Sequence, residues 1–393
     1  MPRNLIHADA IVDYRGVIAS PGAILVEGNQ IIEAGTPQEI GLPENASLTQ
    51  IDSVVTPSFV NTHTHLDLSG VGITPAKESY TSWVEEVVFP IRRDTSSIGD
   101  SVLRGIELVH SGGSSIIGDI SGSEEAAQLV YESHLRATPF VELLGTGTRQ
   151  QSVIEFMNQL PSDFGVEPHA PYSCGLDVYR EAFASGRPVA THLAETLEEL
   201  EYAQHRTGPI AKFVQRIGAW EKEDIPWSSH PIDIVLQLAG DTPCIVAHMN
   251  YIDDCHLQRL ADSNMTVAYC PRASAYFGHT NHRWQEMIDA GVNVSIGTDS
   301  LLCLDTPNRI SVIDEMRFLY HKDKPDPVQL IAMGTIHGAS GLGLDPNLVT
   351  LHRGETAGLL AFMSQGGDPL LEIMNSTTMP IWLSGEIELK KGQ

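Results

Sequence analysis

Two histidines separated by one residue, His63 and His65, end the apolar run that begins at Thr56. In a β-strand, side chains two positions apart point to the same face, so both imidazoles would project side by side at the end of this strand. Two imidazoles in that arrangement can bind one metal ion, although ordinary polar residues at a strand end would show the same spacing. The chemistry of this segment therefore depends on what the rest of the chain brings to it.

Further metal-binding side chains stand at the ends of other predicted strands. His192, His248 and Asp299 each close a short apolar run. With His63 and His65 they supply imidazoles and a carboxylate, which are the ligands of a catalytic zinc or iron site that keeps one position open for water. Independent core histidines are not expected at all of these strand ends together. We therefore predict one divalent metal ion, with zinc preferred and iron or manganese as alternatives.

The elements that must position these residues are short strands alternating with helices between residues 56 and 345. Counted with the first strand, there are eight, which is the pattern of an α/β fold of the (β/α)8 TIM-barrel type. An open, doubly wound sheet would be expected to carry a glycine-rich phosphate fingerprint after its first strand, and the sequence has none there. Barrel strands converge at their carboxyl ends, so the predicted ligands would meet in one mouth. The later predicted strands are 115–119, 138–144, 164–169, 188–192, 244–248, 265–270 and 292–299, and the predicted helices include 100–110, 124–135, 197–217, 231–238 and 308–320.

Strand-like segments also precede and follow the barrel region. Residues 23–35 contain two β-rich runs around a Gly28-Asn29 turn, which predicts a hairpin. Short apolar runs return after Leu344, at 348–351, 358–362 and 379–383. We predict a small composite β-sandwich domain from residues 1–55 and 346–393, and a metal-dependent hydrolase barrel from residues 56–345.

Composition narrows the class of partner. The net charge of −26 and the pI near 4.8 disfavour nucleic acid and anionic membranes, because the field of the protein repels both. No apolar run approaches the roughly 18 residues that a membrane span needs, and the first residues lack the apolar core of a signal peptide. Five scattered cysteines without a C-x-x-C pair favour reduced thiols. We expect a cytoplasmic protein with a small-molecule heterocyclic substrate, and homo-oligomerisation through exposed barrel helices is compatible with the sequence.

Four motifs, taken in order, resemble the amidohydrolase superfamily, in the branch that includes cytosine, guanine and S-adenosylhomocysteine deaminases and triazine hydrolases. They are P-x-F-V-N-x-H-x-H at 57–65, H-L-A-E-T at 192–196, V-A-H at 246–248 and I-G-T-D-S at 296–300. The likeness covers nearly the whole chain. Relatives of this kind add a composite β-domain to their barrel, which agrees with the predicted domains.

The resemblance implies that His63, His65, His192 and Asp299 bind one divalent metal ion. Binuclear relatives bridge two ions with a carboxylated lysine on a middle strand. The only lysine between His65 and His192 is Lys77, in a predicted loop. The resemblance therefore favours a mononuclear site, whose ion would lower the pKa of water toward neutrality.

The resemblance also implies catalytic roles. Asp299 is similar to the residue that accepts the proton of the attacking water, His248 to the one that orients and polarises it, and Glu195 to the proton shuttle that protonates a ring nitrogen of the substrate. A carboxylate favoured by the dipole of a helix N-terminus is the alternative explanation of Glu195. The rest of the acidic cluster at 195–201 is interpreted as a solvated helix face. His169 resembles a histidine that contacts substrate, and a structural histidine is its alternative.

The segments at 63–69, 82–93, 140–145 and 270–279 look most like aminodeoxyfutalosine deaminases, which remove the purine 6-amino group from a nucleoside intermediate of menaquinone synthesis. Relatives acting on S-adenosylhomocysteine carry a glutamate just before the position of Trp83, where this chain has Thr81-Ser82. We expect a metal-dependent hydrolytic deaminase of an aminopurine nucleoside, with 6-amino-6-deoxyfutalosine as the first candidate. The alternatives are guanine, 8-oxoguanine, S-adenosylhomocysteine or a triazine as substrate and, more remotely, a non-catalytic metal- or nucleoside-binding module.

Overall fold

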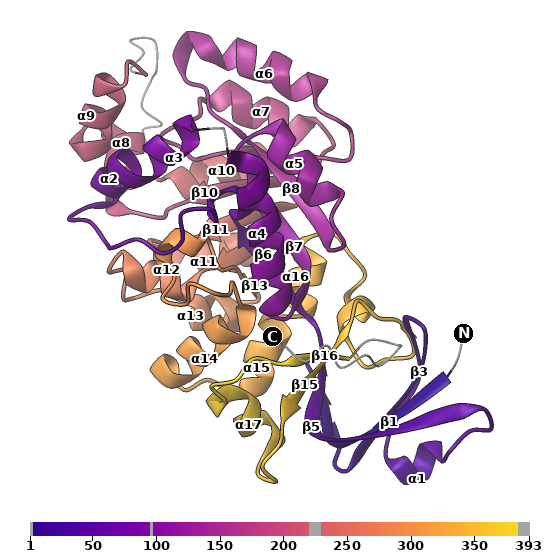
Figure 1. The fold of residues 1–393 in the computed structure, drawn as a ribbon. Helices are drawn as coiled ribbons and strands as arrows, with labels where there is room; N and C mark the ends of the chain where they lie inside the picture. The colour runs from indigo at the N-terminus through magenta and orange to yellow at the C-terminus, as the bar shows by residue number, and fades with distance from the viewer. Residues whose placement is uncertain (1–2, 95–96, 220–228, 384–393) are drawn as a thin grey trace. The chain divides into compact units, whose positions relative to one another are not determined.

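The computed structural model describes residues 3–94, 97–219 and 229–383 (Figure 1). Its contacts divide the chain into two compact units. One unit contains Met1–Asn61, Leu108–Ile116 and Arg309–Gln393, and the other contains Thr62–Glu107 and Ile117–Asn308. The domain boundaries expected after residues 55 and 345 stay predictions.

Eight strands form the barrel sheet, in the order β13-β12-β11-β10-β9-β8-β7-β6. Each lies within a few residues of its expected position, which confirms the predicted barrel. Neighbouring strands from β8 to β13 are parallel. The strands are β6 (Phe59–Thr64), β7 (Ser114–Ser121), β8 (Arg136–Leu143), β9 (Gly165–Pro168), β10 (Val189–Leu193), β11 (Cys244–His248), β12 (Met265–Tyr269) and β13 (Asn293–Ile296).

The first and last barrel strands meet where the ligand motifs lie. An isolated parallel bridge joins Thr64 to Asp299, and the backbone N–H groups of Thr298 and Asp299 donate to the carbonyl oxygen of His63 at 2.9 and 3.1 Å. Every residue of β7, β10, β11 and β12 is buried, because strands of this kind are covered on both faces. Closure of the barrel thus places the β6 motif beside the β13 motif.

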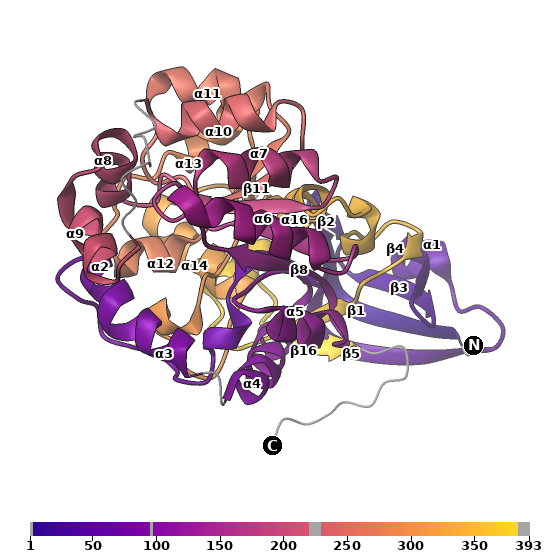
Figure 2. The same ribbon diagram turned by 90° about the horizontal axis from the view of Figure 1, so that it is seen from above.

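Helices lie outside the barrel strands, as α6, α7, α10 and α11 show in the turned view (Figure 2). The predicted helix at 197–217 is wrong as one element: it is two helices, separated at Arg206, which has the left-handed φ of 57°. Pro209 in the first turn of the second helix cannot continue the first. The helices of the unit that contains Thr62–Glu107 and Ile117–Asn308, with α4 extending past Glu107, are α2 (Tyr80–Trp83), α3 (Phe89–Arg93), α4 (Ile98–Ser111), α5 (Glu124–Tyr131), α6 (Gln150–Gln159), α7 (Leu176–Ala184), α8 (Leu197–His205), α9 (Gly208–Arg216), α10 (Pro231–Ala239), α11 (Asp254–Ala261), α12 (Pro271–Tyr276) and α13 (Trp284–Asp289).

The other unit contains a mixed sheet with strands from both ends of the chain. Its order is β14-β4-β3-β1-β5-β15-β16, with β2 paired to β1. The hairpin predicted at 23–35 is present as β3 and β4, and Ile6, Ile24 and Leu359 belong to one buried cluster of this unit. The strands are β1 (Arg3–Asp13), β2 (Gly16–Ala19), β3 (Gly22–Glu27), β4 (Gln30–Gly35), β5 (Ala46–Pro57), β14 (Gly354–Glu355), β15 (Leu359–Met363) and β16 (Ile381–Leu383).

One predicted strand of this unit is wrong. The apolar run at 348–351 overlaps a 3-10 helix, η6 (Pro346–Val349). The side chain of Asp345 caps it by accepting from the backbone N–H of Asn347, and Pro346 occupies a first-turn position that suits a helix. The helices of this unit are α1 (Pro37–Ile40), α14 (Val312–Asp323), α15 (Pro327–Met333), α16 (Ile336–Gly341) and α17 (Pro369–Asn375).

Among the residues that the structure describes, no helix has the length and hydrophobicity that a membrane crossing requires.

Candidate active site

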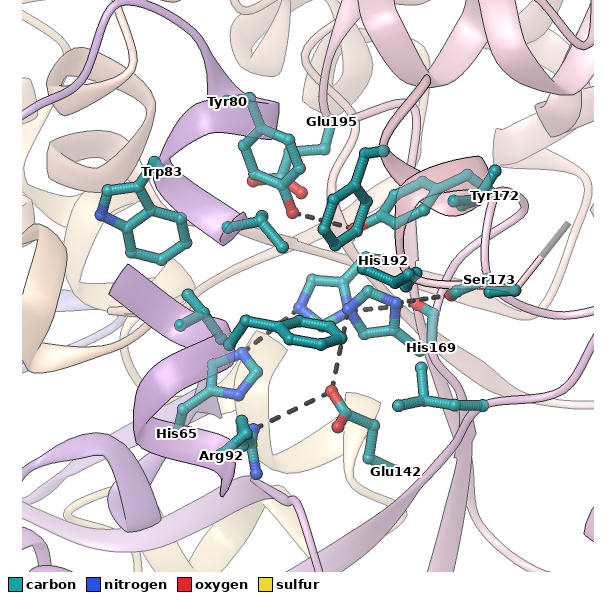
Figure 3. Close-up of a pocket in the computed structure, with 18 of the residues that line it drawn as sticks. His65, Tyr80, Trp83, Arg92, Glu142, His169, Tyr172, Ser173, His192 and Glu195 are labelled. Atoms are coloured by element: carbon teal, nitrogen blue, oxygen red, sulfur yellow. Dashed lines mark hydrogen bonds and ion pairs between the residues drawn. The ribbon is translucent and has the colours of Figure 1, made fainter. Parts of the chain in front are cut away.

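The carboxyl ends of four barrel strands bring the predicted metal-binding side chains together. Nε2 of His65, just after β6, lies 3.3 Å from Nε2 of His192 on β10 (Figure 3) and 3.6 Å from Oδ1 of Asp299, which follows β13. The potential ligand atoms of His63, His192 and His248 also lie within 4.8 Å of one another. The sequence expectation that these side chains meet at the barrel mouth therefore agrees with the structure.

The distances suit one divalent ion. Zinc binds imidazole nitrogen at about 2.0–2.1 Å, so two tetrahedral ligands stand about 3.3 Å apart. That is the separation of the two Nε2 atoms of His65 and His192. Lys77 lies outside this cluster, since its side chain is exposed and pairs with Glu86 at 2.8 Å. These side chains thus fit a site for a single metal ion, and their role as its ligands stays a prediction.

Two acceptor atoms lie beside Nδ1 of His192. Nδ1 of His192 lies 2.9 Å from Oε1 of Glu167 and 3.1 Å from the carbonyl oxygen of His169, which are both acceptors. A neutral imidazole that donates from Nδ1 has an unprotonated Nε2. Nδ1 forms its hydrogen bond with the carbonyl oxygen of His169, and the charge of Glu167 beside it favours the same tautomer, which leaves the lone pair of Nε2 facing His65.

Burial and nearby carboxylates oppose each other at His192. Burial is the largest single influence and lowers the pKa of this imidazole, but Glu167, with Glu195 and Asp299 adding to its effect, raises the pKa to about 10. Burial also raises the pKa of Glu167, to about 7. A cation bound at Nε2 would take the place of the proton that the pair otherwise retains.

The backbone is left-handed at three of the strand ends that form the mouth. The φ angles are 52° at Ala194, 71° at His248 and 60° at Asp299. Residues other than glycine avoid this region, at a cost of order 1–3 kcal/mol each, and such residues cluster at active sites. The turns redirect the chain directly after the buried strands, so that His248 and Asp299 join the cluster.

A second group of potential ligands is excluded by its hydrogen bonds. His230, Asp253 and His256 lie within 4.8 Å of one another, in ligand atoms, away from the barrel strands. Nδ1 of His230 accepts from the backbone N–H of Ile232, and Nδ1 of His256 accepts from that of Asp253. Each Nε2 must then carry the proton of the neutral ring, so neither can bind a cation there. These histidines cap helices α10 and α11.

Glu195 lies beside the cluster, as the sequence predicts. Its side chain is 4% exposed, and Oε1 lies 3.7 Å from Nε2 of His248. Oε2 of Glu195 and Nε2 of His248 have no hydrogen-bond partner among the described residues. Burial raises the pKa of Glu195 to about 8, with Asp299 and Glu199 adding to the rise and His192 opposing it. The group is therefore able to hold a proton at neutral pH.

The acidic residues that follow Glu195, up to Glu201, were predicted to form a solvated helix face, and this prediction is wrong for Glu199. Glu199 is fully buried, and its two oxygens accept from the backbone N–H groups of Ala194 at 2.9 Å and Glu195 at 2.7 Å. Thr196 caps α8 by accepting from the N–H of Glu199. The T-x-x-E spacing at 196–199 is the signal that could have placed this glutamate in the first turn of a helix.

A cavity of about 320 Å³ opens beside the cluster. Apolar and aromatic side chains form much of its wall, and Figure 3 shows Tyr80 and Trp83 on one side and Tyr172 on another. The hydroxyls of Tyr80 and Tyr172 are hydrogen-bonded at 3.0 Å. Cavities of this size with a few convergent polar groups suit a small heterocyclic molecule. The aromatic wall includes Tyr80, Trp83, Phe89, Tyr172, Phe213 and Phe277.

Arg92 lines the cavity on the side opposite Glu195, and the sequence had predicted no role for it. Arg92 forms an ion pair with Asp67. Its Nη2 also lies 3.9 Å from Oε1 of Glu142, and a dashed line marks this second contact in Figure 3. His169 stands beside them, with Nε2 3.7 Å from Oε1 of Glu142 and Nδ1 2.7 Å from Oγ of Ser173. Burial lowers the pKa of His169 to about 3, so this imidazole is neutral. His169 lines the cavity, and the expected contact with substrate stays a prediction.

Most of the chain matches one known protein family. The profile described as "Amidohydrolase family" matches residues 54–382, which is most of the chain. The chain belongs to the amidohydrolase family. This confirms the predicted superfamily, and with the barrel it confirms that the protein is an enzyme of the amidohydrolase type.

Individual relatives of this amidohydrolase include a 5-methylthioadenosine/S-adenosylhomocysteine deaminase of Pyrococcus abyssi, 27% identical over 356 residues that cover 83% of this chain and 77% of the relative. Two solved structures share the fold. The Helicobacter pylori aminofutalosine deaminase in complex with methylthio-coformycin has a TM-score of 0.79, 22% identity, and coverage of 97% of this chain and 98% of that chain. An adenosine deaminase from Xanthomonas campestris with bound zinc has a TM-score of 0.75, 17% identity, and coverage of 97% and 91%.

Amidohydrolases are metal-dependent, in agreement with the histidine and aspartate cluster of this chain. The sequence predicted no role for five charged residues near the site, of which four are carboxylates and one is an arginine. Glu142 and Glu167 interrupt apolar strand runs, and a charged residue inside such a run is the signal that could have found them. The others are Asp67, Arg92 and Glu199.

Proposed function

We propose that this amidohydrolase removes the amino group of an aminopurine nucleoside by hydrolysis. The observation that carries the proposal is the position of the buried Glu195 carboxyl, which lies 3.7 Å from His248 at the edge of both the histidine cluster and the aromatic cavity. Burial, which raises its pKa to about 8, favours a carboxyl that can donate a proton. A heterocycle in the cavity would present a ring nitrogen to this carboxyl and an adjacent carbon to the cluster. The proposed ligands of one divalent ion are His63, His65, His192 and Asp299.

The proposed roles follow from what each side chain can reach. Glu195 donates its proton to the ring nitrogen, which makes the neighbouring amine-bearing carbon electrophilic; transfer of this kind is typically worth about 10²–10⁴ in rate. His248 orients the attacking water, and Asp299 accepts its proton as the oxygen–carbon bond forms. Asp299 then returns that proton to the amino group, which leaves as ammonia when the carbon–nitrogen bond breaks, and Glu195 takes back a proton as the carbonyl product forms. The divalent ion would lower the pKa of the water toward neutrality. Nε2 of His248 is suited to its role because it has no hydrogen-bond partner among the described residues.

The proposed substrate class is supported by the relatives. The Pyrococcus abyssi protein bears the name of a deaminase of two purine nucleosides, and the Helicobacter pylori structure that of an aminofutalosine deaminase. We take 6-amino-6-deoxyfutalosine as the first candidate and menaquinone biosynthesis as the corresponding pathway. Zinc is the first candidate because the similar Xanthomonas campestris structure contains zinc. Iron and manganese are the alternatives, because imidazole and carboxylate suit all three ions. A cytoplasmic location and a homo-oligomeric state stay predictions.

The test is ammonia release by protein loaded separately with zinc, iron or manganese. The panel contains aminodeoxyfutalosine, adenosine, S-adenosylhomocysteine, guanine and cytosine, with Glu195→Gln as the inactive control. A strong preference for an aminopurine nucleoside supports the proposal, and preference for the first substrate supports the named candidate. Ammonia from guanine alone, or from none of the five, contradicts the proposed substrate class.

The other candidates differ in an observable product. A triazine chlorohydrolase would release chloride rather than ammonia, whereas guanine and 8-oxoguanine deaminases would act on free bases. A non-catalytic binding module would bind nucleoside without turnover. Such a module has no need of a proton carrier like Glu195 at its metal cluster, which disfavours it.

A further inference from the structure

Glu142 presents an unsatisfied carboxylate to the cavity. It belongs to β8, and its side chain is 11% exposed. Two nitrogen atoms form ion-pair contacts with its Oε1: Nη2 of Arg92 at 3.9 Å and Nε2 of His169 at 3.7 Å (Figure 3). Neither oxygen of Glu142 accepts a hydrogen bond from any residue that the structure describes. Because Glu142 lines the cavity, a ligand bound there can supply the hydrogen-bond donor that the described residues do not.

The surroundings keep Glu142 ionised. Burial is the largest single influence and raises the pKa of this carboxyl, but Arg92 together with His169 and His192 outweighs burial, and the pKa lies below its ordinary value. An ionised carboxylate only accepts hydrogen bonds. Any substrate group that contacts Glu142 must therefore be a donor.

Arg92 is held in place from the side away from the cavity. It pairs with Asp67, which also accepts from the backbone N–H of Gly122 at 3.2 Å. A Cβ atom at Gly122 would stand 1.2 Å from Nη1 of Arg92, so the guanidinium occupies the space that a side chain there would fill. Gly122 and Asp67 thus form a cradle for Arg92, and the cradle fixes the charge that Glu142 faces.

The chemistry of the proposed substrate class identifies the donor. In a 6-aminopurine nucleoside, ring atoms N1, N3 and N7 carry lone pairs without hydrogen, and N9 carries the sugar. Apart from the amino group that leaves, the ribose hydroxyls are the donors that this core offers. The geometry points to Glu142 as the residue that accepts a hydrogen bond from a ribose hydroxyl and thereby selects nucleosides over free bases. This inference rests on the proposed function.

The test combines changes in protein and substrate. Wild-type metal-loaded protein is assayed with adenosine, 2′-deoxyadenosine, 3′-deoxyadenosine and adenine. Because a hydrogen bond to a charged group is lost, removal of the contacted hydroxyl should lower kcat/KM roughly 10- to 100-fold in the wild type. In Glu142→Gln and Glu142→Ala, the same removal should cost less than about threefold, because the charged acceptor is already absent. Glu155→Gln, an exposed carboxylate on α6, should keep the wild-type discrimination.

A second variant tests the cradle without altering the cavity-lining carboxylate. Gly122→Ala should displace Arg92 and reduce the discrimination between adenosine and its deoxy analogues. Binding of the products gives a readout independent of turnover. By calorimetry, the wild type should bind inosine more tightly than hypoxanthine, and Glu142→Gln should reduce that difference.

The possible results distinguish failure of the Glu142 role from failure of the proposed deaminase function. If the wild type deaminates adenosine and both deoxy analogues equally well, the proposed function stands and the role of Glu142 is overturned. The role is also overturned if Glu142→Gln retains full discrimination. If free bases or other heterocycles are turned over and no nucleoside is, both the proposed function and the inference fail.

Discussion

Glu199 holds the backbone of Glu195: Oε2 of Glu199 accepts a hydrogen bond of 2.7 Å from the amide N–H of Glu195. Its other oxygen accepts from Ala194, whose φ of 52° begins the turn between β10 and α8. One buried carboxylate therefore satisfies both N–H groups of a strained turn. Glu195, the proposed proton carrier, belongs to that turn, so the orientation of its side chain depends on Glu199.

We expect Glu199→Gln to lower kcat about tenfold. A glutamine can present one oxygen acceptor where the carboxylate presents two, so one backbone N–H of the turn loses its charged partner. Steady-state kinetics would measure the loss, and circular dichroism would verify the fold. Glu201→Gln, in the same helix but exposed, is the matched control. Equal kcat in the two variants would show that Glu199 does not position Glu195.

We expect Glu195→Gln to lose turnover by at least about 10²-fold, because an amide cannot carry the proton to the substrate. Metal content should be unchanged, since Glu195 is outside the proposed ligand set. Single-turnover assays and elemental analysis of the same preparation would measure both quantities. Near-normal turnover would remove the assigned role.

We expect His63→Ala and Asp299→Ala to retain less metal than the wild type. Each substitution removes one proposed ligand from a group whose donor atoms lie within 4.8 Å of one another. Elemental analysis after dialysis against a weak chelator would measure the loss. His205→Ala, on the exposed side of α8, is the control. A full metal complement in both ligand variants would contradict the site.

We expect Glu167→Gln to weaken metal affinity roughly 10- to 100-fold, because it removes the charge that orients His192. The amide can still accept from Nδ1, so the protein should fold. Competition with a chromogenic chelator would measure the affinity, with the exposed Asp163→Asn as the control. Unchanged affinity would mean that the carbonyl oxygen of His169 suffices to orient the ring.

We expect metal-free protein to lose stability as pH rises. Burial raises the pKa of Asp119 to about 7, with Asp67 adding to the rise, so the folded state binds a proton that the unfolded state has released. Its contribution is present below the unfolded pKa, about 4, and is lost as pH rises to about 7. Urea unfolding should show a decrease on the order of 2–4 kcal/mol over this range that Asp119→Asn reduces. A parallel pH dependence in the variant would contradict the assignment.

Much of the site was predictable because ligand residues in barrels end strands. His63, His65, His192, His248 and Asp299 each close an apolar run, and parallel strands bring their carboxyl ends to one mouth. Periodicity located the strands because both faces of most are buried. Periodicity did not locate the break at Arg206, because the apolar spacing continues through it while the backbone does not.

The carboxylates around the site were less predictable. Glu199 lies in an acidic stretch that ends in the exposed Glu201, and only the path of the turn before α8 buries Glu199. Glu142 and Arg92 are 50 positions apart, and no local pattern pairs them. Their significance depends on the cavity that separates them from Glu195.

The sequence by itself determined the family, the barrel and the donor atoms at its mouth, because strand period and residue type are local properties. Only the tertiary structure decided which charges face one another: Glu167 against His192, Glu199 against the Glu195 turn, and Arg92 against Glu142. These pairings join segments that are distant in the chain or reversed by a turn. Their energies depend on burial, which exists only once the barrel has closed.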